Sequence, residues 1–515
     1  MILKTVIRSG AYADSVTLMK AARELSGMPG VDDAAVIMGT EENKAILRAS
    51  GLLDESLESA GPTDMLVAVR AADGEAAAGA LSAVDELLTG QRGGPDRESS
   101  RAPRSLETAL AAHPELNLAL ISVAGRYAGG LAWEALERDL HVMIFSDNVP
   151  LETEVALKRE AHEKGLIVMG PDCGTAIVNG APLGFANVVS RGPVGIVAAS
   201  GTGLQEVSCL LSESGAGISQ AIGTGSRDVS DDVGGITFLD AIDALGCDAD
   251  TQVIVLVSKP PDPSVHERIR RATGALDKPV VSVFLGTEPE GPYDARTLAE
   301  AAAKASDVAL GGEAGADSGR GTLSRPKADE RRERARGLAS SVSAGRRYLR
   351  ALMSGGTFAS EAALVLGDME IPDLCANVRG GGAARLEDPL RSVGNAVVDM
   401  GADEFTVGRP HPMIDYSLRV ARIAEEARDP QTAVVLLDVV LGYGAHRDPA
   451  SELEGVVRDV SSRVCVVCSV TGTERDPQVR SVVERRLRSA GASVMPSNEA
   501  AAGLAGEVVR MLGER

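Results

Sequence analysis

Residues 191–211, RGPVGIVAASGTGLQEVSCLL, decide the fold. Apolar β-formers fill the first half, and after residues 200–203 the apolar residues recur at helical spacing, which predicts a strand, a tight turn and a helix. Glycines let an anion approach the backbone, and the first turn of a helix offers unpaired N–H groups. The turn therefore predicts a phosphate site at Ser200, Gly201 and Thr202. The alternative is that Ser200 only caps the helix.

A second stretch, residues 432–449, has a similar design: TAVVLLDVVLGYGAHRDP. An apolar strand runs into a glycine turn made of Gly442, Tyr443 and Gly444. Two such turns from distant parts of the chain could face each other. We therefore expect them to hold one doubly charged group between two helix N-termini.

Composition excludes several classes of function. The chain has 515 residues, of which 44% are hydrophobic, and a net charge of −21. The basic run at residues 331–336, RRERAR, is interleaved with acids in a polar segment, so we interpret it as solvated linker and expect no nucleic-acid partner. The N-terminus lacks a signal-peptide pattern and no apolar run is long enough to span a bilayer, so we expect no membrane contact and a cytoplasmic location.

The cysteines predict neither disulfides nor a metal site. There are six in the whole chain. Cys465 and Cys468 form a C-x-x-C, but they lie in a strand-like run where positions i and i+3 point to opposite faces. We therefore place both in the core and expect no metal.

Strands and helices alternate along the chain, which predicts an α/β fold with several parallel sheets, Rossmann-like and flavodoxin-like. In the first domain we expect strands at 3–7, 34–38 and 65–69 and helices at 14–25, 44–49 and 75–88. The predicted organisation is a domain at 1–90, a linker at 91–105, a Rossmann-like half at 106–190, an α/β domain at 191–310, a polar, partly mobile linker at 311–345 and an α/β domain at 346–515.

Loops at the carboxyl ends of parallel strands carry ligands in open sheets. The strand at 252–257 ends just before Lys259, which we expect within reach of Ser200, as is Arg227 after the strand at 218–222. Arg409 and His411 lie in a proline-rich loop, which suits cationic ligand residues. For each loop the alternative is that it only turns the chain.

Several motifs together resemble a known family. The strand and turn at 193–202, the GPDCGT loop at 170–175 and the DKPVVSVFLG strand at 277–286 resemble the α subunit of succinyl-CoA synthetase. The part from SGGT at 354–357 through GYGAH at 442–446 looks like the carboxyl-terminal domain of that enzyme's β subunit. With DEFTVGRPHPMID at 403–415 and LLDVVLGYGAH at 436–446, the chain is similar over nearly its full length to the FdrA family of acyl-CoA-synthetase-like proteins.

The resemblance implies a phosphate site between two helix N-termini, at Ser200, Gly201, Thr202, Gly442, Tyr443 and Gly444. It also implies a CoA-binding half at 106–190, with CoA as a possible cofactor at Gly125, Arg126, Asn148, Pro150 and Cys173.

Three departures from that family bear on mechanism. Between His266 and His411 the chain has no histidine, which argues against a phosphohistidine relay. In the synthetase a glutamate orients the histidine that is phosphorylated, and the resemblance places Lys259 at the position of that glutamate. The assigned units leave no room for a nucleotide-binding ATP-grasp domain, so we expect a separate chain to supply one.

The leading hypothesis is a subunit of an oxamate carbamoyltransferase-type enzyme of purine and allantoin catabolism, with phosphate or carbamoyl phosphate as substrate. Lys259, Arg409 and His411 would hold a carboxylate and the developing oxyanion. One alternative is an NDP-forming acyl-CoA synthetase that needs a separate ATP-grasp subunit, and another is a non-catalytic scaffold or metabolite sensor. The expected partners are a small-molecule carboxylate, further copies of the chain and subunits encoded nearby.

Overall fold

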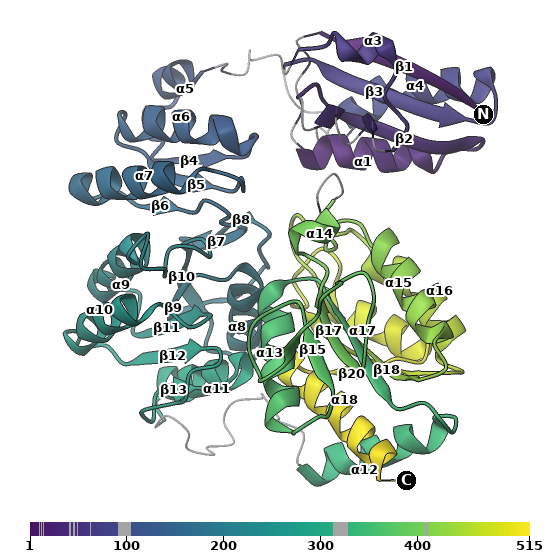
Figure 1. Ribbon diagram of the computed structural model, residues 1–515. Coiled ribbons are helices and arrows are strands. Elements are labelled where there is room, and N and C mark those ends of the chain that lie inside the picture. The colour runs from purple at the N-terminus through teal and green to yellow at the C-terminus, as the bar shows by residue number, and fades with distance from the viewer. Residues whose placement is uncertain are drawn as a thin grey trace. The chain divides into compact units, whose positions relative to one another are not determined.

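The computed structural model describes residues 1–514 apart from 10, 12, 14, 41, 42, 45, 46, 49, 62, 91–102, 104, 313–327 and 407–409. These residues form two compact units. The first is Met1–Glu115 with Val407–Pro410, and the second is Leu116–Thr406 with His411–Arg515 (Figure 1). Most of the predicted linker 91–105 and the candidate residue Arg409 lie outside the described residues.

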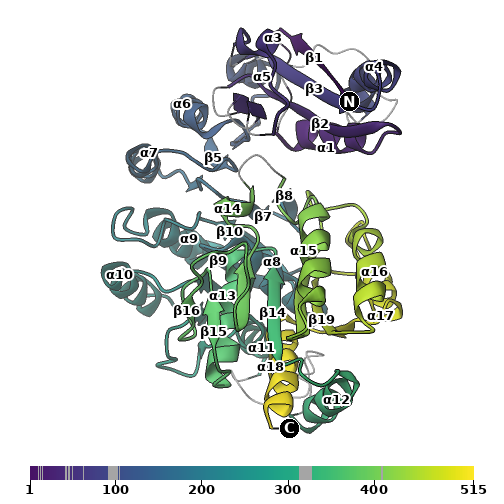
Figure 2. The ribbon, with the colours of Figure 1, turned by 45° about the vertical axis from the view of Figure 1, so that its right-hand side comes forward.

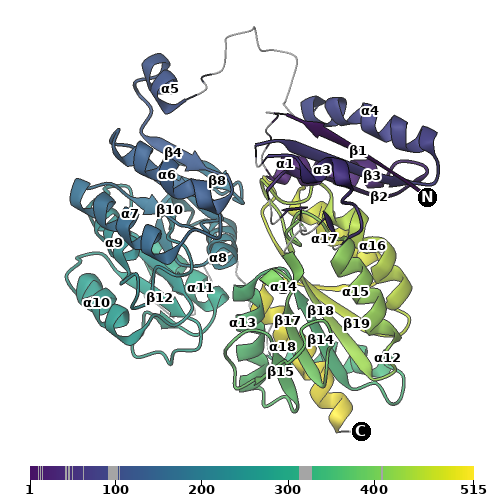
Figure 3. The ribbon, with the colours of Figure 1, turned by 45° about the horizontal axis from the view of Figure 1, so that its top comes forward.

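The first unit contains a three-stranded sheet in the order β1-β3-β2 (Figure 3). Its strands are β1 (Ile2–Arg8), β2 (Val31–Met38) and β3 (Met65–Ala71), and its helices include α1 (Ser15–Ser26), α3 (Glu55–Glu58) and α4 (Gly74–Gly90). The strands confirm the predicted elements. Unlike the sheets of the second unit, this sheet is antiparallel throughout, because β3 pairs antiparallel with both neighbours.

The second unit begins with a small parallel sheet in the order β4-β5-β6. Helix α5 (Leu106–Ala112) still belongs to the first unit. The elements of the small sheet are β4 (Leu118–Ile121), α6 (Gly125–Leu136), β5 (His141–Ile144), α7 (Leu151–Lys164) and β6 (Val168–Met169). A hairpin of β7 (Thr175–Val178) and β8 (Ala181–Gly184) then joins the next sheet.

A seven-stranded sheet follows, in the order β13-β12-β11-β9-β10-β7-β8. Its further elements are β9 (Arg191–Ala198), α8 (Gly201–Glu213), β10 (Ile218–Gly223), α9 (Ile236–Cys247), β11 (Val253–Ser258), α10 (Pro263–Gly274), β12 (Val280–Phe284), β13 (Asp294–Ala295) and α11 (Leu298–Ala309). The strand, turn and helix predicted for residues 191–211 are confirmed by β9 and α8.

A second seven-stranded sheet, entirely parallel, has the order β16-β15-β17-β14-β18-β19-β20. Its strands are β14 (Tyr348–Met353), β15 (Leu374–Ala376), β16 (Ala384–Arg385), β17 (Asn395–Asp399), β18 (Thr432–Val440), β19 (Cys465–Thr471) and β20 (Ser493–Met495). Its helices are α13 (Gly356–Asp368), α14 (Asp403–Thr406), α15 (Ser417–Arg428), α16 (Pro449–Val460), α17 (Arg480–Ser489) and α18 (Asn498–Gly513). On β19 the side chains of Cys465 and Cys468 are buried, which confirms their place in the core.

The interpretation of residues 331–336 as solvated linker is wrong. These residues belong to helix α12 (Ala328–Ser341), which packs on α18. Ala335 and Ala339, one turn apart, are fully buried there. The many charged residues favoured a solvated segment, but a helix with many charges can still bury a narrow stripe of small residues.

Among the described residues, none of the helices has both the length and the apolar character needed to cross a membrane.

Candidate functional site

The turn between β9 and α8 meets a second helix N-terminus. Ser200 is the N-cap of α8, and its Oγ accepts a hydrogen bond from Gly203 N at 3.0 Å. The same hydroxyl lies 2.6 Å from Oγ1 of Thr357, in the first turn of α13. Helices α8 and α13 lie side by side in the second unit (Figures 1 and 2). The positive ends of two helix dipoles therefore converge on one place.

The start of α13 comes directly from β14 through residues 354–357, SGGT. The buried carboxylate of Asp438 accepts hydrogen bonds from the backbone N and the hydroxyl of Ser354, and the buried Arg419 also binds Asp438. Gly355 is the N-cap and offers no side-chain acceptor. A Cβ on Gly355 would lie 2.8 Å from Cγ2 of Thr202, so glycine lets the two turns approach. The first amides of α13 thus lack the serine cap that α8 has.

Lys259 and Asp399 flank this uncapped end. A Cβ on Gly356 would lie 2.9 Å from Oδ2 of Asp399 and 3.3 Å from Nζ of Lys259, so both side chains border the same small space. Burial raises the pKa of Asp399 to about 6, although an N–H bond from Gly401 and the charge of Lys259 oppose the shift. Asp399 is therefore a carboxyl that can take up or release a proton near neutral pH.

His411 lies beside Asp399. A Cβ on Gly401 would meet His411 Nε2 at 2.9 Å and Asp399 Oδ1 at 3.2 Å. Burial, helped by the charge of Arg419, lowers the pKa of His411 to about 4, so its ring is neutral at pH 7. Its Nδ1 accepts a hydrogen bond from Met413 N at 3.3 Å, which assigns the ring hydrogen to Nε2. In this arrangement His411 can donate a hydrogen bond from Nε2, while its Nδ1 lone pair accepts from Met413 N.

The second predicted anion seat needs a correction. The N–H groups of Gly442 and Tyr443 donate to Gln478 Oε1 and Ala186 O, both within 3.0 Å, so they are not free for a phosphate. Helix α16 starts only at Pro449 and is capped by Asp448. The glycine turn instead packs on Phe185, whose ring centroid lies 6.2 Å from that of His411. Thus α13, and not the turn at 442–444, supplies the second helix N-terminus.

A buried carboxyl group on each of α8 and α13 bonds to the seven-stranded sheet domain to which the other helix belongs. Glu206 of α8 accepts from Asn498 N at the start of α18 and from the hydroxyl of Thr471. Glu361 of α13 accepts from Leu298 N at the start of α11. Burial raises the pKa of both carboxyls, that of Glu361 to about 8. Each helix at the site thus caps a helix of the other sheet, which fixes α8 against α13.

The loops predicted to hold CoA lie at the end of the small sheet. Gly125 packs on the backbone of Asp147 and Asn148, where a Cβ would be only 2.1 Å from Asp147 O. Arg126 is exposed and stacks over Tyr127, and Pro150 is the N-cap of α7.

Cys173 is different from the other predicted cofactor residues. It is 2% exposed, and burial raises the pKa of its thiol to about 12. The thiol faces the core, which argues against a role in holding a cofactor.

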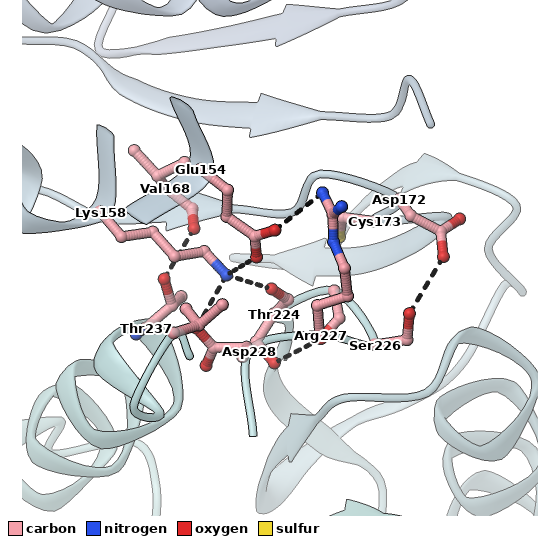
Figure 4. A network of polar contacts seen from close by, with 12 residues as sticks. Glu154, Lys158, Val168, Asp172, Cys173, Thr224, Ser226, Arg227, Asp228 and Thr237 are labelled. Carbon is pink, nitrogen blue, oxygen red and sulfur yellow. Dashed lines mark hydrogen bonds and ion pairs between the residues drawn. The ribbon is translucent and has the colours of Figure 1, made fainter. Parts of the chain in front are cut away.

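A buried ion-pair network joins this small sheet to the larger one (Figure 4). Lys158 on α7 donates to Glu154 at 2.8 Å, to Asp228 at 2.7 Å and to the carbonyl of Thr224 at 3.0 Å. Asp228 in turn accepts from Phe238 N in the first turn of α9, and Arg227 pairs with Glu154 at 2.8 Å. Arg227, expected near Ser200, therefore serves this network.

Thr357 and Asp399 were not among the predicted site residues. The signal for Thr357 was present, because SGGT at 354–357 repeats the Ser-Gly pattern of SGTG at 200–203 after an apolar strand. Asp399 also ends a buried strand, β17, where carboxyl-end loops gather ligand residues.

Three family models match parts of the chain. The model described as CoA binding domain matches residues 189–286, and the one described as CoA-ligase matches 352–508. The CoA-binding match includes Ser200 and Lys259 and starts beyond the loops at 124–174 that the sequence favoured for CoA. The third, described as "AllF, heavy metal-associated domain", matches residues 1–104.

A heavy metal does not fit this N-terminal stretch. Residues 1–104 contain no cysteine and no histidine, the side chains that soft and borderline metals prefer. Across the described residues there is also no group of three His, Cys, Asp or Glu side chains that could hold a metal ion.

Similar proteins were found for the whole chain and for its middle. An uncharacterized Escherichia coli protein, YahF, is 40% identical over 510 residues, which is 97% of each chain. The succinate–CoA ligase [ADP-forming] subunit alpha of Staphylococcus epidermidis is 27% identical over 34% of this chain and 58% of its own length. A solved structure, the dinucleotide-forming acetyl-coenzyme A synthetase 1 of Ca. Korarchaeum cryptofilum with phosphate and ADP, matches at 15% identity and a TM-score of 0.31, covering 82% of this chain and 87% of that one. The chain belongs to the family of YahF, the FdrA-like proteins with CoA-binding and CoA-ligase domains of the succinyl-CoA synthetase type.

Proposed function

We propose that this chain is a CoA-ligase-type subunit that transfers an acyl group between an acyl phosphate and the thiol of CoA. The observation that carries the proposal is the meeting of two helix N-termini, with Ser200 Oγ 2.6 Å from Thr357 Oγ1. Two dipole ends and the ammonium of Lys259 favour a doubly charged phosphate there. The CoA-binding and CoA-ligase matches span both helices and support CoA as the partner substrate.

The proposed reaction uses the residues around that seat. The thiol of CoA attacks the acyl carbonyl, the bond from the carbonyl carbon to the phosphate oxygen breaks, and phosphate leaves onto the two helix ends. Asp399, ionised above pH 6, accepts the thiol proton, and the Nε2–H of His411 donates to the developing oxyanion. We assign the formation of the acyl phosphate from a small carboxylate to a nucleotide-binding partner chain.

Carbamoyl transfer to oxamate is the second candidate. None of the comparisons supports it, and the ligase interpretation replaces it as the leading one. One observation keeps it: the Nδ1 lone pair of His411 accepts from Met413 N and Nε2 carries the ring hydrogen, an arrangement that favours direct use of a ready-made acyl phosphate, the class to which carbamoyl phosphate belongs.

One experiment separates these candidates. The purified chain is incubated with acetyl, succinyl or carbamoyl phosphate, each with CoA or with oxamate, and phosphate release is measured. CoA-dependent release that Lys259→Ala abolishes and Lys164→Ala does not would support the ligase proposal, because Lys164 bonds a helix carbonyl on α6. Release only with carbamoyl phosphate and oxamate would favour the second candidate. No release with any pair, together with no calorimetric affinity for CoA, would reject both.

A further inference from the structure

A loop at the edge of the second seven-stranded sheet borders an open pocket outside the site between the N-termini of α8 and α13, here called the two-helix site. Residues 377–385, NVRGGGAAR, are here called the triglycine loop. They run from the end of β15 through the short strand β16, beside α13 (Figure 2). The loop borders a cavity of about 630 Å³. Among the lining residues are Asn377, Arg379, Gly380, Gly382 and Arg385.

The loop has a fixed shape. Its three glycines have φ of +130°, +62° and +67°, values that other residues rarely adopt. A Cβ on Gly381 would lie 2.1 Å from the carbonyl oxygen of Ala363 on α13, so this glycine is packed on the helix. Gly380 and Gly382, in contrast, have nothing within 4 Å of such a Cβ. The middle glycine thus anchors the turn while its neighbours leave their faces open to the cavity.

The turn offers free donors. None of the N–H groups of Gly380, Gly381 and Gly382 donates to another described residue. Successive unpaired N–H groups in a tight turn form a concave surface that binds anions.

Two guanidinium groups add positive charge to this surface. Arg379 and Arg385 are exposed, and neither has an ion pair or side-chain hydrogen bond with any residue that the structure describes. The chain carries a net charge of −21, and many of its arginines pair with acids, among them Arg70, Arg296, Arg350, Arg422 and Arg486. Planar guanidinium groups match phosphate oxygens in geometry as well as in charge.

The cavity is joined to the rim of the two-helix site. Asn377, the first residue of the loop, donates from Nδ2 to the carbonyl of Asp399 at 3.0 Å and accepts from Asp399 N at 2.7 Å. The first residue of the loop is thereby tied to the strand end that carries the candidate proton acceptor.

We propose that the triglycine loop is a second anion site, which binds the phosphate group of a small-molecule ligand through Arg379, Arg385 and the free amides of the glycine turn. A nucleotide and a free polyphosphate share this chemistry, and the test below distinguishes them. The proposal does not depend on the acyl-transfer reaction.

The test is calorimetric titration of the full chain with pyrophosphate, with ADP and with adenosine as the uncharged control. The double variant Arg379→Ala/Arg385→Ala should bind the phosphate ligand at least tenfold more weakly. Arg391→Ala removes an exposed arginine of the same segment, 3.9 Å from Asp388, and should leave binding unchanged. Lys259→Ala in the two-helix site should also leave this binding event in place, which separates the two proposals.

Other outcomes would decide the matter in the opposite direction. Equal weakening in Arg391→Ala and the double variant would show general attraction to positive charge and would overturn the proposal. Unchanged affinity in a double variant whose thermal melting matches the parent chain would overturn it as well. If only ADP binds to the loop, the ligand is a nucleotide, and if pyrophosphate binds equally well, the phosphates alone are recognised.

Discussion

Helices α8 and α13 meet at one site, yet their N-termini are built differently. The first turn of α8 is closed by its own Ser200, whose Oγ accepts from Gly203 N. At the start of α13, Gly355 brings no cap, and Thr202, Lys259 and Asp399 border the open end. In both helices a buried glutamate ties the helix to the opposite sheet. The comparison teaches that stability and chemistry are served by different residues: the two buried glutamates hold the helices together, and the end of α13 without a side-chain cap is where we propose that the ligand binds.

The largest expected effect comes from breaking the reciprocal caps. Glu361→Ala leaves Leu298 N without an acceptor, and Glu206→Ala leaves Asn498 N and the Thr471 hydroxyl without one. Each change should cost about 2–4 kcal/mol of stability. Hydrogen exchange should rise at the start of α11 in the first variant and at the start of α18 in the second. Glu425→Ala, at an exposed position of α15, is the control, and equal exchange in all variants would refute the reciprocal arrangement.

The next effect concerns Asp399, whose substitution should change the rate of acyl transfer but not the stability. Asp399→Asn should lower CoA-dependent acyl transfer about 100-fold, within the range of general-base catalysis, without changing the melting temperature by more than a few degrees. Because burial raises the pKa of Asp399 to about 6, the rate of the parent chain should rise as pH increases through 6. The variant should lose that rise. A pH–rate profile for both proteins checks this, and an unchanged profile in the variant would exclude Asp399 as the base.

The pH dependence of stability tests the protonation state of Glu361. The folded state holds the proton of Glu361 up to about pH 8, whereas the unfolded chain releases it near 4.5. Stability is therefore lost as pH rises from 4.5 to 8, by at most about 1.4 kcal/mol per pH unit. Glu361→Gln stays neutral and should flatten this dependence. Thermal melting of both proteins between pH 5 and 8 gives the comparison, and parallel curves would contradict the assignment.

The smallest expected effect compares the two hydroxyls at the seat. Ser200→Ala removes a helix cap and should cost about 1 kcal/mol of stability, whereas Thr357→Val removes only the contact with Ser200 and should cost less. Both should weaken phosphate binding by a similar factor. Calorimetry with inorganic phosphate and thermal melting measure the two quantities. Loss of affinity in Ser200→Ala alone would show that α13 takes no part.

Much of the fold was predictable from the sequence because hydrophobic periodicity and glycine turns are local signals. The strand and helix at 191–211 and the core positions of Cys465 and Cys468 follow directly from that pattern. Helix α12 was missed because its buried stripe is only Ala335 and Ala339 on a charged surface.

The site was only partly predictable because it depends on which turns face each other. The sequence marks Gly442–Gly444 and residues 354–357 equally as glycine turns after strands. Their difference lies in tertiary hydrogen bonds, since Gln478 and Ala186 accept from the amides of Gly442 and Tyr443, whereas no side chain caps the start of α13. Asp399 was missed for the same reason, because its neighbours Lys259 and His411 come from distant segments.

The most direct test of the central claim is a crystal structure of the full chain grown with inorganic phosphate or a non-hydrolysable acyl phosphate analogue. We predict density for one phosphate between the first turns of α8 and α13, within hydrogen-bond distance of Thr357 and Lys259. Density at the turn of Gly442–Gly444, or none between the two helices at saturating ligand, would contradict the account.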